Sequence, residues 1–230
     1  MEKTTYDSFF VKGSSMDPTL CGDSLNSTYG RYDSSSKAIG KIKRFDLVVC
    51  YYPFENAYDY EQPYVPNVSQ RKESATLKVK RIIGLPYETL LIANDFFTIT
   101  NNVTGEVTNY GPNDDPESKI VKVPFQRKEP IEDRNALITL GANEYFVMGD
   151  NWTKKGSTDC CNPSYGGAAK CIYRENIAGV IFRLDGICTY AKLTCGSCGA
   201  EVDRDCKRER FFKGKKQFRF SSNIRLGVCW

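Results

Sequence analysis

A serine and a lysine, each inside its own motif, are the residues of this chain best suited to covalent chemistry. Ser15 lies in the segment 13–20 (GSSMDPTL) and Lys80 in the segment 78–86 (KVKRIIGLP). An alcohol is a poor nucleophile and must lose its proton to a base as it attacks. The chain has no histidine, which excludes a Ser-His-Asp triad and a histidine-ligated zinc protease. Lysine is an attested alternative base for a serine nucleophile.

Lys80 can accept that proton only when its amine is neutral. The reference pKa of lysine is about 10.4, and a catalytic lysine needs a value of roughly 7–8, which burial favours because it penalises the ammonium. Strand alternation places Lys80 on one face with Lys78 and Ile82. The alternatives are an ordinary solvated lysine on a strand and, for Ser15, a turn serine preceding an Asp-Pro pair.

A third motif, 145–151 (YFVMGDN), follows later in the chain. Together the three motifs resemble those of the type I signal peptidases, which are serine proteases that use lysine as the general base. The resemblance extends from about Phe9 to Arg183. It implies that Ser15, directly before a methionine, is the nucleophile, and that Lys80, directly before an arginine, is the base.

The resemblance also implies supporting roles for four other residues. Ser157 matches the serine that orients the catalytic lysine, Asp159 matches a nearby structural acid, and Asp150 belongs to the Gly-Asp-Asn motif itself. Backbone N–H groups around Ser15 and Gly13 are expected to form the oxyanion hole, since glycine allows close approach of the backbone. The chain departs from the family pattern at Tyr87-Glu88, where Gly-Asp is usual, and at Cys160-Cys161, where an arginine is usual.

The implied function is an endopeptidase that removes signal peptides from exported preproteins, as in bacteria, favouring small residues at the −1 and −3 positions. No cofactor is implied for the chemistry. Family members are membrane-associated, with the catalytic domain on the extracytoplasmic side. This chain shows no run approaching the roughly 18 apolar residues of a membrane helix, so as given it is expected to be soluble. Its net charge of +4 does not favour nucleic acid as a partner.

Two other functions remain open at this point. One is a related Ser-Lys protease that cleaves itself or one dedicated partner, as the self-cleaving repressors do. The other is a non-catalytic binding or assembly module on the same scaffold.

The sequence predicts a mostly β fold, a signal-peptidase-type catalytic core over residues 1–187 with a small Cys-rich appendage over 188–230. Inserted loops and hairpins are expected at about 24–41, 53–70 and 101–135. Runs rich in β-branched and aromatic residues predict the strands, at 9–11, 46–52, 76–83, 89–93, 96–100, 120–123, 136–140, 144–148 and 177–183. No long segment has helical periodicity.

The last third of the chain carries eight of the ten cysteines. Cys195 and Cys198 form a C-x-x-C pair, Cys206 follows, and Cys188 completes a candidate set of four thiolates for a structural zinc. Disulfides and free thiols are the alternatives. The basic, aromatic segment 207–220 suits an anionic membrane surface, although a solvated strand pair with its aromatics packed inward accounts for it as well.

Overall fold

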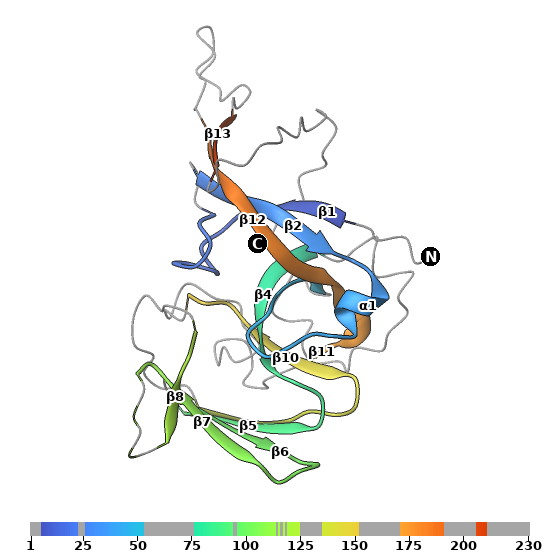
Figure 1. The fold of residues 1–230 in the computed structure, drawn as a ribbon, viewed down its shortest axis with the longest axis vertical. Helices are drawn as coiled ribbons and strands as arrows, with labels where there is room; N and C mark the ends of the chain where they lie inside the picture. The colour runs from blue at the N-terminus through green and yellow to red at the C-terminus, as the bar shows by residue number, and fades with distance from the viewer. Residues whose placement is uncertain are drawn as a thin grey trace, which may run out of the picture.

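The computed structural model describes residues 6–22, 26–52, 76–93, 96–113, 115, 117, 119–124, 135–151, 171–190 and 206–210. These form two sheets, one above the other in Figure 1, with little helix. The mostly β fold class is therefore confirmed. The predicted loop at 53–70 lies outside the described residues.

The larger sheet has eight strands in the order β1-β2-β12-β3-β4-β10-β11, with β13 paired to β12. Neighbouring strands in it are antiparallel. Its strands are β1 (Tyr6–Phe10), β2 (Asn26–Asp33), β3 (Leu47–Tyr52), β4 (Thr76–Gly84), β10 (Glu144–Met148), β11 (Ile172–Tyr173), β12 (Ile177–Tyr190) and β13 (Cys206–Arg210). The short helix α1 (Ser36–Ile39) follows β2, and the 3-10 helix η3 (Arg174–Asn176) precedes β12.

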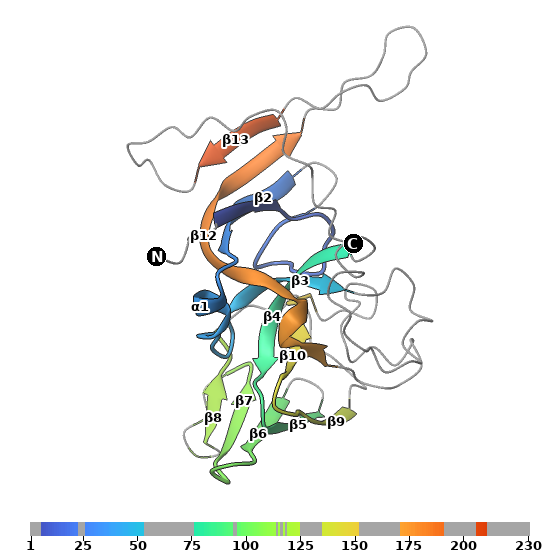
Figure 2. The same cartoon turned by 90° about the vertical axis from the view of Figure 1, so that its right-hand side faces the viewer.

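The smaller sheet has five strands in the order β8-β7-β6-β5-β9. They are β5 (Glu88–Ala93), β6 (Phe96–Asn101), β7 (Val107–Gly111), β8 (Ile120–Lys122) and β9 (Asn135–Thr139). Apolar side chains alternate along β5, where Leu90 and Ile92 are buried and Leu91 is exposed, as expected for a sheet with one solvated face. The sheet continues directly from β4 through a turn at 85–87 (Figure 2).

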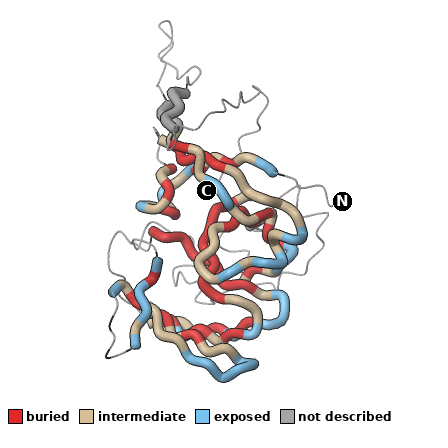
Figure 3. The backbone as a smooth tube through the Cα atoms, viewed as in Figure 1, coloured by how far each residue is buried: buried red, intermediate tan, exposed pale blue. Residues whose placement is uncertain are grey.

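The larger sheet curls on itself. Phe9 on β1, Val49 on β3 and Val79 on β4 belong to one buried cluster, although β2 and β12 separate β1 from β3 in the strand order. A flat sheet would hold such strands too far apart for contact, because neighbouring strands are about 4.8 Å apart. Figure 3 shows the buried residues on the inside of this curl. The curl brings the segment that follows β1 close to β3 and β4.

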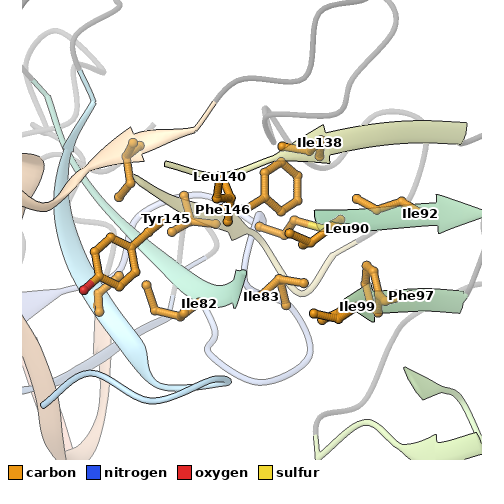
Figure 4. Close-up of a cluster of buried hydrophobic side chains, with 14 of the residues drawn as sticks. Ile82, Ile83, Leu90, Ile92, Phe97, Ile99, Ile138, Leu140, Tyr145 and Phe146 are labelled. Atoms are coloured by element: carbon orange, nitrogen blue, oxygen red, sulfur yellow. The ribbon is translucent and has the colours of Figure 1, made fainter. Parts of the chain in front are cut away.

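A second buried cluster joins the two sheets. It contains Ile82 and Ile83 of β4, Phe146 of β10, and Leu90 and Phe97 of the smaller sheet. Figure 4 shows these side chains packed between the strands of both sheets. Gly84 lies at this junction, where a Cβ would come within 2.7 Å of a methyl carbon of Leu140, so the backbone and the packed leucines meet closely there.

The prediction of a loop at 24–41 is wrong. Residues 26–33 form β2, which lies between β1 and β12, and 36–39 form α1. The segment is polar, and its Ser27 and Thr28 are nonetheless buried, because the sheet and the neighbouring turn satisfy their polar groups. Gly30 is needed in this strand, since a Cβ there would lie 2.3 Å from the carbonyl oxygen of Arg183.

β12 runs without a break across residue 187, the predicted end of the catalytic core. Residues 188–190 therefore continue a strand of the larger sheet, and 206–210 pair with it as β13. The remainder of the predicted appendage lies outside the described residues.

Candidate active site

The turn that carries Ser15 is held at both ends by the beginning of β2. The N–H of Val11 donates to the carbonyl of Thr28 at 2.9 Å, and the Ser27 hydroxyl donates to the carbonyl of Val11 at 2.6 Å. At the other end, the N–H of Cys21 donates to the Thr28 hydroxyl at 2.8 Å. The turn is thus closed by contacts on two consecutive residues of one strand.

Buried apolar residues of the same turn anchor it in the core of the larger sheet. Met16 and Leu20 are fully buried in the cluster with Phe9 and Val79, whereas Ser15, one position before Met16, is partly exposed. The N–H of Leu20 donates to the carbonyl of Met16 at 2.9 Å. These contacts fix the turn in the core and leave its serine at the surface of the curl.

Gly13 shapes the start of the turn. Its φ is 92°, in the region that favours glycine, and its N–H donates to the carbonyl of Gly22 at 2.5 Å. That N–H is therefore occupied in this structure. Gly13 therefore allows the backbone to bend at this point. The expected role of its N–H in an oxyanion hole stays a prediction.

Lys80 is fully buried in the middle of β4. It pairs with Val48 of β3, and its neighbour Val79 pairs with Val49. Val49 and Val79 face the cluster that contains Met16, while Val48 belongs to the cluster between the sheets. Alternation therefore places Lys80 on the face of Val48, as the sequence predicted, with apolar residues on the neighbouring strand.

An ion pair lies directly beside this lysine. Arg81 donates from Nε to one oxygen of Asp150 at 2.8 Å and from Nη2 to the other at 2.6 Å. Both side chains are buried, Asp150 almost completely. Arg81 also donates to the carbonyl of Phe45 at 2.8 Å. Such two-pronged pairing fixes geometry as well as charge, so it sets the position of the segment after β10 relative to β4.

Asn151 connects that segment to the Ser15 turn. Its N–H donates to the carbonyl of Ser15 at 3.0 Å, and its Nδ2 donates to the carbonyl of Ser14 at 2.8 Å. Consecutive residues thus bind the Lys80 strand on one side, through Asp150, and the serine turn on the other. The structure brings together the three motifs that the sequence singled out.

Comparison with known proteins identifies the family of this chain. The family model described as "Signal peptidase, peptidase S26" matches residues 2–181. The chain belongs to this signal peptidase family. It is also 26% identical over 149 residues to Signal peptidase I P of Bacillus subtilis subsp. natto, covering 57% of this chain and 68% of that protein.

Family membership makes the chain a peptidase and implies signal-peptide-bearing substrates. Within the described residues, no helix has the length and hydrophobicity needed to span a membrane. Ser157 and Asp159 lie outside the described residues, as do Cys195 and Cys198. Cys188 and Cys206 lie on β12 and β13, where Cys206 pairs with Tyr190 and Cys188 with Arg208.

Two contributions to the site were not assigned from the sequence. Ser27 and Thr28, which close the serine turn, fall in a segment predicted to be a loop. Asn151 was part of a motif without an assigned role, and its two contacts depend on residues more than 130 positions away. The pairing of β4 with β10, in which Met148 lies opposite Arg81, places Asp150 and Asn151 beside the Lys80 motif, and the curl of the larger sheet brings the serine turn to them.

Proposed function

We propose that this protein is a serine endopeptidase that removes signal peptides from exported preproteins, with Ser15 as the nucleophile and Lys80 as the general base. The observation that carries the proposal is the fully buried Lys80, next to an Arg81–Asp150 pair whose following residue, Asn151, holds the Ser15 turn. Buried charged side chains gathered in this way are typical of catalytic sites.

In the proposed reaction the Ser15 hydroxyl oxygen attacks the carbonyl carbon of the scissile bond while its proton passes to Lys80 Nζ. The tetrahedral intermediate then collapses, and the Lys80 ammonium donates that proton to the leaving amine. A water molecule, deprotonated by the neutral Lys80 amine, hydrolyses the resulting ester and regenerates Ser15. Burial lowers the pKa of Lys80 because it disfavours the ammonium, which allows the amine to act near neutral pH.

The finer features follow from the family resemblance. Ser157 orients Lys80, Asp159 supports that region, and substrates carry small residues at −1 and −3. The protein works at the membrane surface, on the extracytoplasmic side, where signal peptides emerge. A Ser-Lys protease dedicated to self-cleavage or to one partner is the second candidate, and the segment KRIIGLP with the following Gly-Asp-Asn motif favours the signal peptidase.

The test is cleavage of a synthetic signal-peptide substrate by the purified chain, compared among wild type, Ser15→Ala and Ser14→Ala. We expect Ser15→Ala to abolish cleavage and Ser14→Ala to retain substantial activity, because Ser14 contributes its carbonyl to Asn151 and alanine keeps that carbonyl. An inactive Ser14→Ala beside an active Ser15→Ala would overturn the assignment. Cleavage of the chain itself with no cleavage of the added substrate would favour the dedicated protease.

For the C-terminal cysteines we propose a structural zinc held by Cys195, Cys198 and Cys206 and completed by Cys188 or another thiolate. In support, the register offsets Cys188 and Cys206 by two positions on adjacent strands, within the range of diagonal neighbours in a sheet. Elemental analysis and thiol counts with and without a chelator test it. Zinc well below one atom per chain, with oxidised cysteines, would replace the metal by disulfides.

A further inference from the structure

Phe45, in the turn before β3, has a backbone conformation that is unusual for its residue type. Its φ is 70°, in the left-handed region, where a residue with a Cβ is strained. In the described part of the chain, Tyr87 and Lys119 also have positive φ, but both are exposed. Phe45 is instead partly buried against the cluster between the sheets. Such strain persists where surrounding contacts impose it, so the contacts of Phe45 are informative.

The backbone of Phe45 connects the β3–β4 pair with the side chain of Arg81. The N–H of Phe45 donates to the carbonyl of Ile82 at 2.8 Å, and the N–H of Ile82 donates to the carbonyl of Asp46 at 2.9 Å. Between these two contacts, the carbonyl of Phe45 accepts from Nη1 of Arg81 at 2.8 Å. The left-handed residue therefore presents its carbonyl to the guanidinium while the pairing of the strands continues around it.

This carbonyl is a third acceptor for the Arg81 guanidinium. The contacts from Nε and Nη2 go to the two oxygens of Asp150. Two parallel contacts fix an arginine and a carboxylate relative to each other, but the pair can still move as one unit. The contact with Phe45 ties that unit to the turn before β3. It therefore also bears on Asn151, which follows Asp150 and holds the serine turn.

The ring of Phe45 contacts the smaller sheet. It lies edge-on to the ring of Tyr110 on β7, with the ring centres 5.3 Å apart and an angle of 85° between the planes. Such aromatic pairs have a defined geometry, and both side chains pack against the cluster between the sheets. A glycine at position 45 would relieve the backbone strain and keep the carbonyl, but it would lose this ring contact. The ring is thus what phenylalanine adds at this position.

We propose that Phe45 is a positioning residue for the reaction, because its ring, held by Tyr110, fixes the carbonyl that binds Arg81. The Arg81–Asp150 pair in turn aligns Asn151 and the serine turn. The inference rests on the proposed function, since it assigns part of the alignment of the nucleophile. It gives the smaller sheet a part in activity through a contact with the larger sheet.

The neighbouring Arg44 contacts the smaller sheet in a different way. Its guanidinium lies 5.6 Å from the centre of the Tyr110 ring and binds both oxygens of Glu88. These contacts join the two sheets through side chains, whereas Phe45 reaches the site through its own carbonyl. Glu88→Gln is therefore a control that weakens the junction of the sheets and leaves Phe45 and Tyr110 in place.

The experiment measures kcat and KM per folded molecule, for a synthetic signal-peptide substrate, in wild type and in variants of Phe45 and Tyr110. Phe45→Gly and Tyr110→Leu should each lower kcat about tenfold and leave KM nearly unchanged, because a small misplacement of a catalytic group costs up to about a hundredfold in rate. Phe45→Tyr keeps the ring and should recover most of the activity that Phe45→Gly loses. The double variant should lose little more than either single variant, since both changes break one contact.

Ile92→Ala is the control for a loss of packing. Ile92 is buried on β5 in the same cluster, so its replacement should lower the midpoint of urea unfolding and leave kcat per folded molecule unchanged. If Phe45→Gly and Tyr110→Leu show the same behaviour, the ring contributes to packing only and the proposal is overturned. Losses of kcat that add in the double variant would also overturn it. Phe45→Leu takes the place of Phe45→Gly if the glycine variant does not fold.

A measurement without turnover separates this inference from the proposed function. It uses Ser15→Ala protein labelled with ¹⁵N in its arginine side chains, in which the Nε–H resonance of Arg81 is assigned by its absence from Arg81→Lys. This resonance should shift, and its proton should exchange faster with solvent, in Phe45→Gly and Tyr110→Leu but not in Ile92→Ala.

The two failures then give different results. A changed Arg81 resonance without signal-peptide cleavage by the wild-type protein would keep the positioning of Arg81 and reject the proposed function. Cleavage by the wild-type protein with an unchanged Arg81 resonance in the Phe45 and Tyr110 variants would reject the inference alone. A changed resonance with normal kcat in those variants would reject it as well.

Discussion

The two sheets of this protein bury different kinds of residue. Among the described residues, the interior of the smaller sheet is apolar, and its buried charge, Glu88, lies at the junction with the larger sheet. The larger sheet buries two lysines, an arginine, an aspartate and an asparagine close to the serine turn, namely Lys78, Lys80, Arg81, Asp150 and Asn151. Buried charge is costly, so its concentration in one region supports the proposal that this region is the active site.

Among the described residues, one Arg–carboxylate pair with two contacts lies beside Lys80 and another lies at the junction of the two sheets. Arg81 binds Asp150 beside Lys80. Arg44 binds Glu88 with distances of 2.5 and 3.0 Å, and Glu88 also accepts from the N–H of Leu85 at 2.7 Å. The first pair connects two motifs of the site and the second connects the two sheets. The two pairs therefore make similar contacts in different places. Variants of each pair can distinguish an effect on the site from an effect on the junction of the sheets.

The largest expected difference between the two sheets concerns their lysines. Lys80→Met should lower cleavage by about a thousandfold or more, because it removes the proposed general base. It should not reduce the free energy of unfolding, since a buried amine is replaced by an apolar chain of similar length. Lys122→Met on the smaller sheet should change neither. Cleavage assays and urea unfolding check both properties, and a Lys80→Met protein with near-normal turnover would contradict the assignment.

The two ion pairs give the next largest effect. Asp150→Asn should lower the free energy of unfolding by about 3 kcal/mol or more, because Arg81 stays buried without its carboxylate. Glu88→Gln should cost less, since Arg44 is better exposed to solvent. Per folded molecule, Asp150→Asn should lose about ten- to a hundredfold in kcat/KM through misplacement of the site, and Glu88→Gln should keep its activity. Equal losses of activity would show that the junction also sets the site.

A smaller effect is expected from single hydrogen bonds. Asn151→Ala removes the contact to the Ser14 carbonyl and should cost about 1 kcal/mol of stability, together with about a tenfold loss of kcat/KM. The control is Asn109→Ala on β7, which removes a hydrogen bond of 2.9 Å from the Thr98 hydroxyl. It should cost a similar stability and no activity. Unchanged kcat/KM in Asn151→Ala would remove Asn151 from the positioning of Ser15.

The smallest effect appears only at alkaline pH. Burial, with a contribution from Asp7, raises the pKa of Tyr32 to about 12, above the value of about 10 in an unfolded chain. Between these values the folded protein keeps a proton that the unfolded chain loses, so the free energy of unfolding falls as pH rises from about 10 to about 12. Tyr32→Phe should remove part of this fall in denaturant titrations at pH 8 and 11. An identical fall in both proteins would show that Tyr32 does not contribute.

Several strands could be predicted from the sequence because they are apolar in the expected period. The predicted strands at 46–52 and 144–148 correspond closely to β3 and β10. β2 could not be predicted, because Ser27 and Thr28 are buried only through partners such as the carbonyl of Val11. Polar side chains can be buried in a strand when backbone groups distant in the sequence satisfy their hydrogen bonds. The local sequence pattern does not reveal such partners.

The site likewise combines features that the sequence predicted with features that it did not. The segments of Ser15 and Lys80 were found from their motifs, and alternation along β4 correctly placed Lys78 on the face of Lys80. The contacts of Asn151 with the serine turn depend on the register between β10 and β4, together with the curl of the larger sheet. Those relations arise from packing across the whole fold, so the sequence alone did not reveal them.

The pH dependence of signal-peptide cleavage by the wild-type protein tests the central claim most directly. If the buried amine of Lys80 is the general base, kcat/KM should rise with pH through an apparent pKa of about 8 or lower, well below the value of about 10.4 for a solvated lysine. It should then reach a plateau. A rate that continues to rise to pH 10 would contradict a neutral, buried lysine as the base.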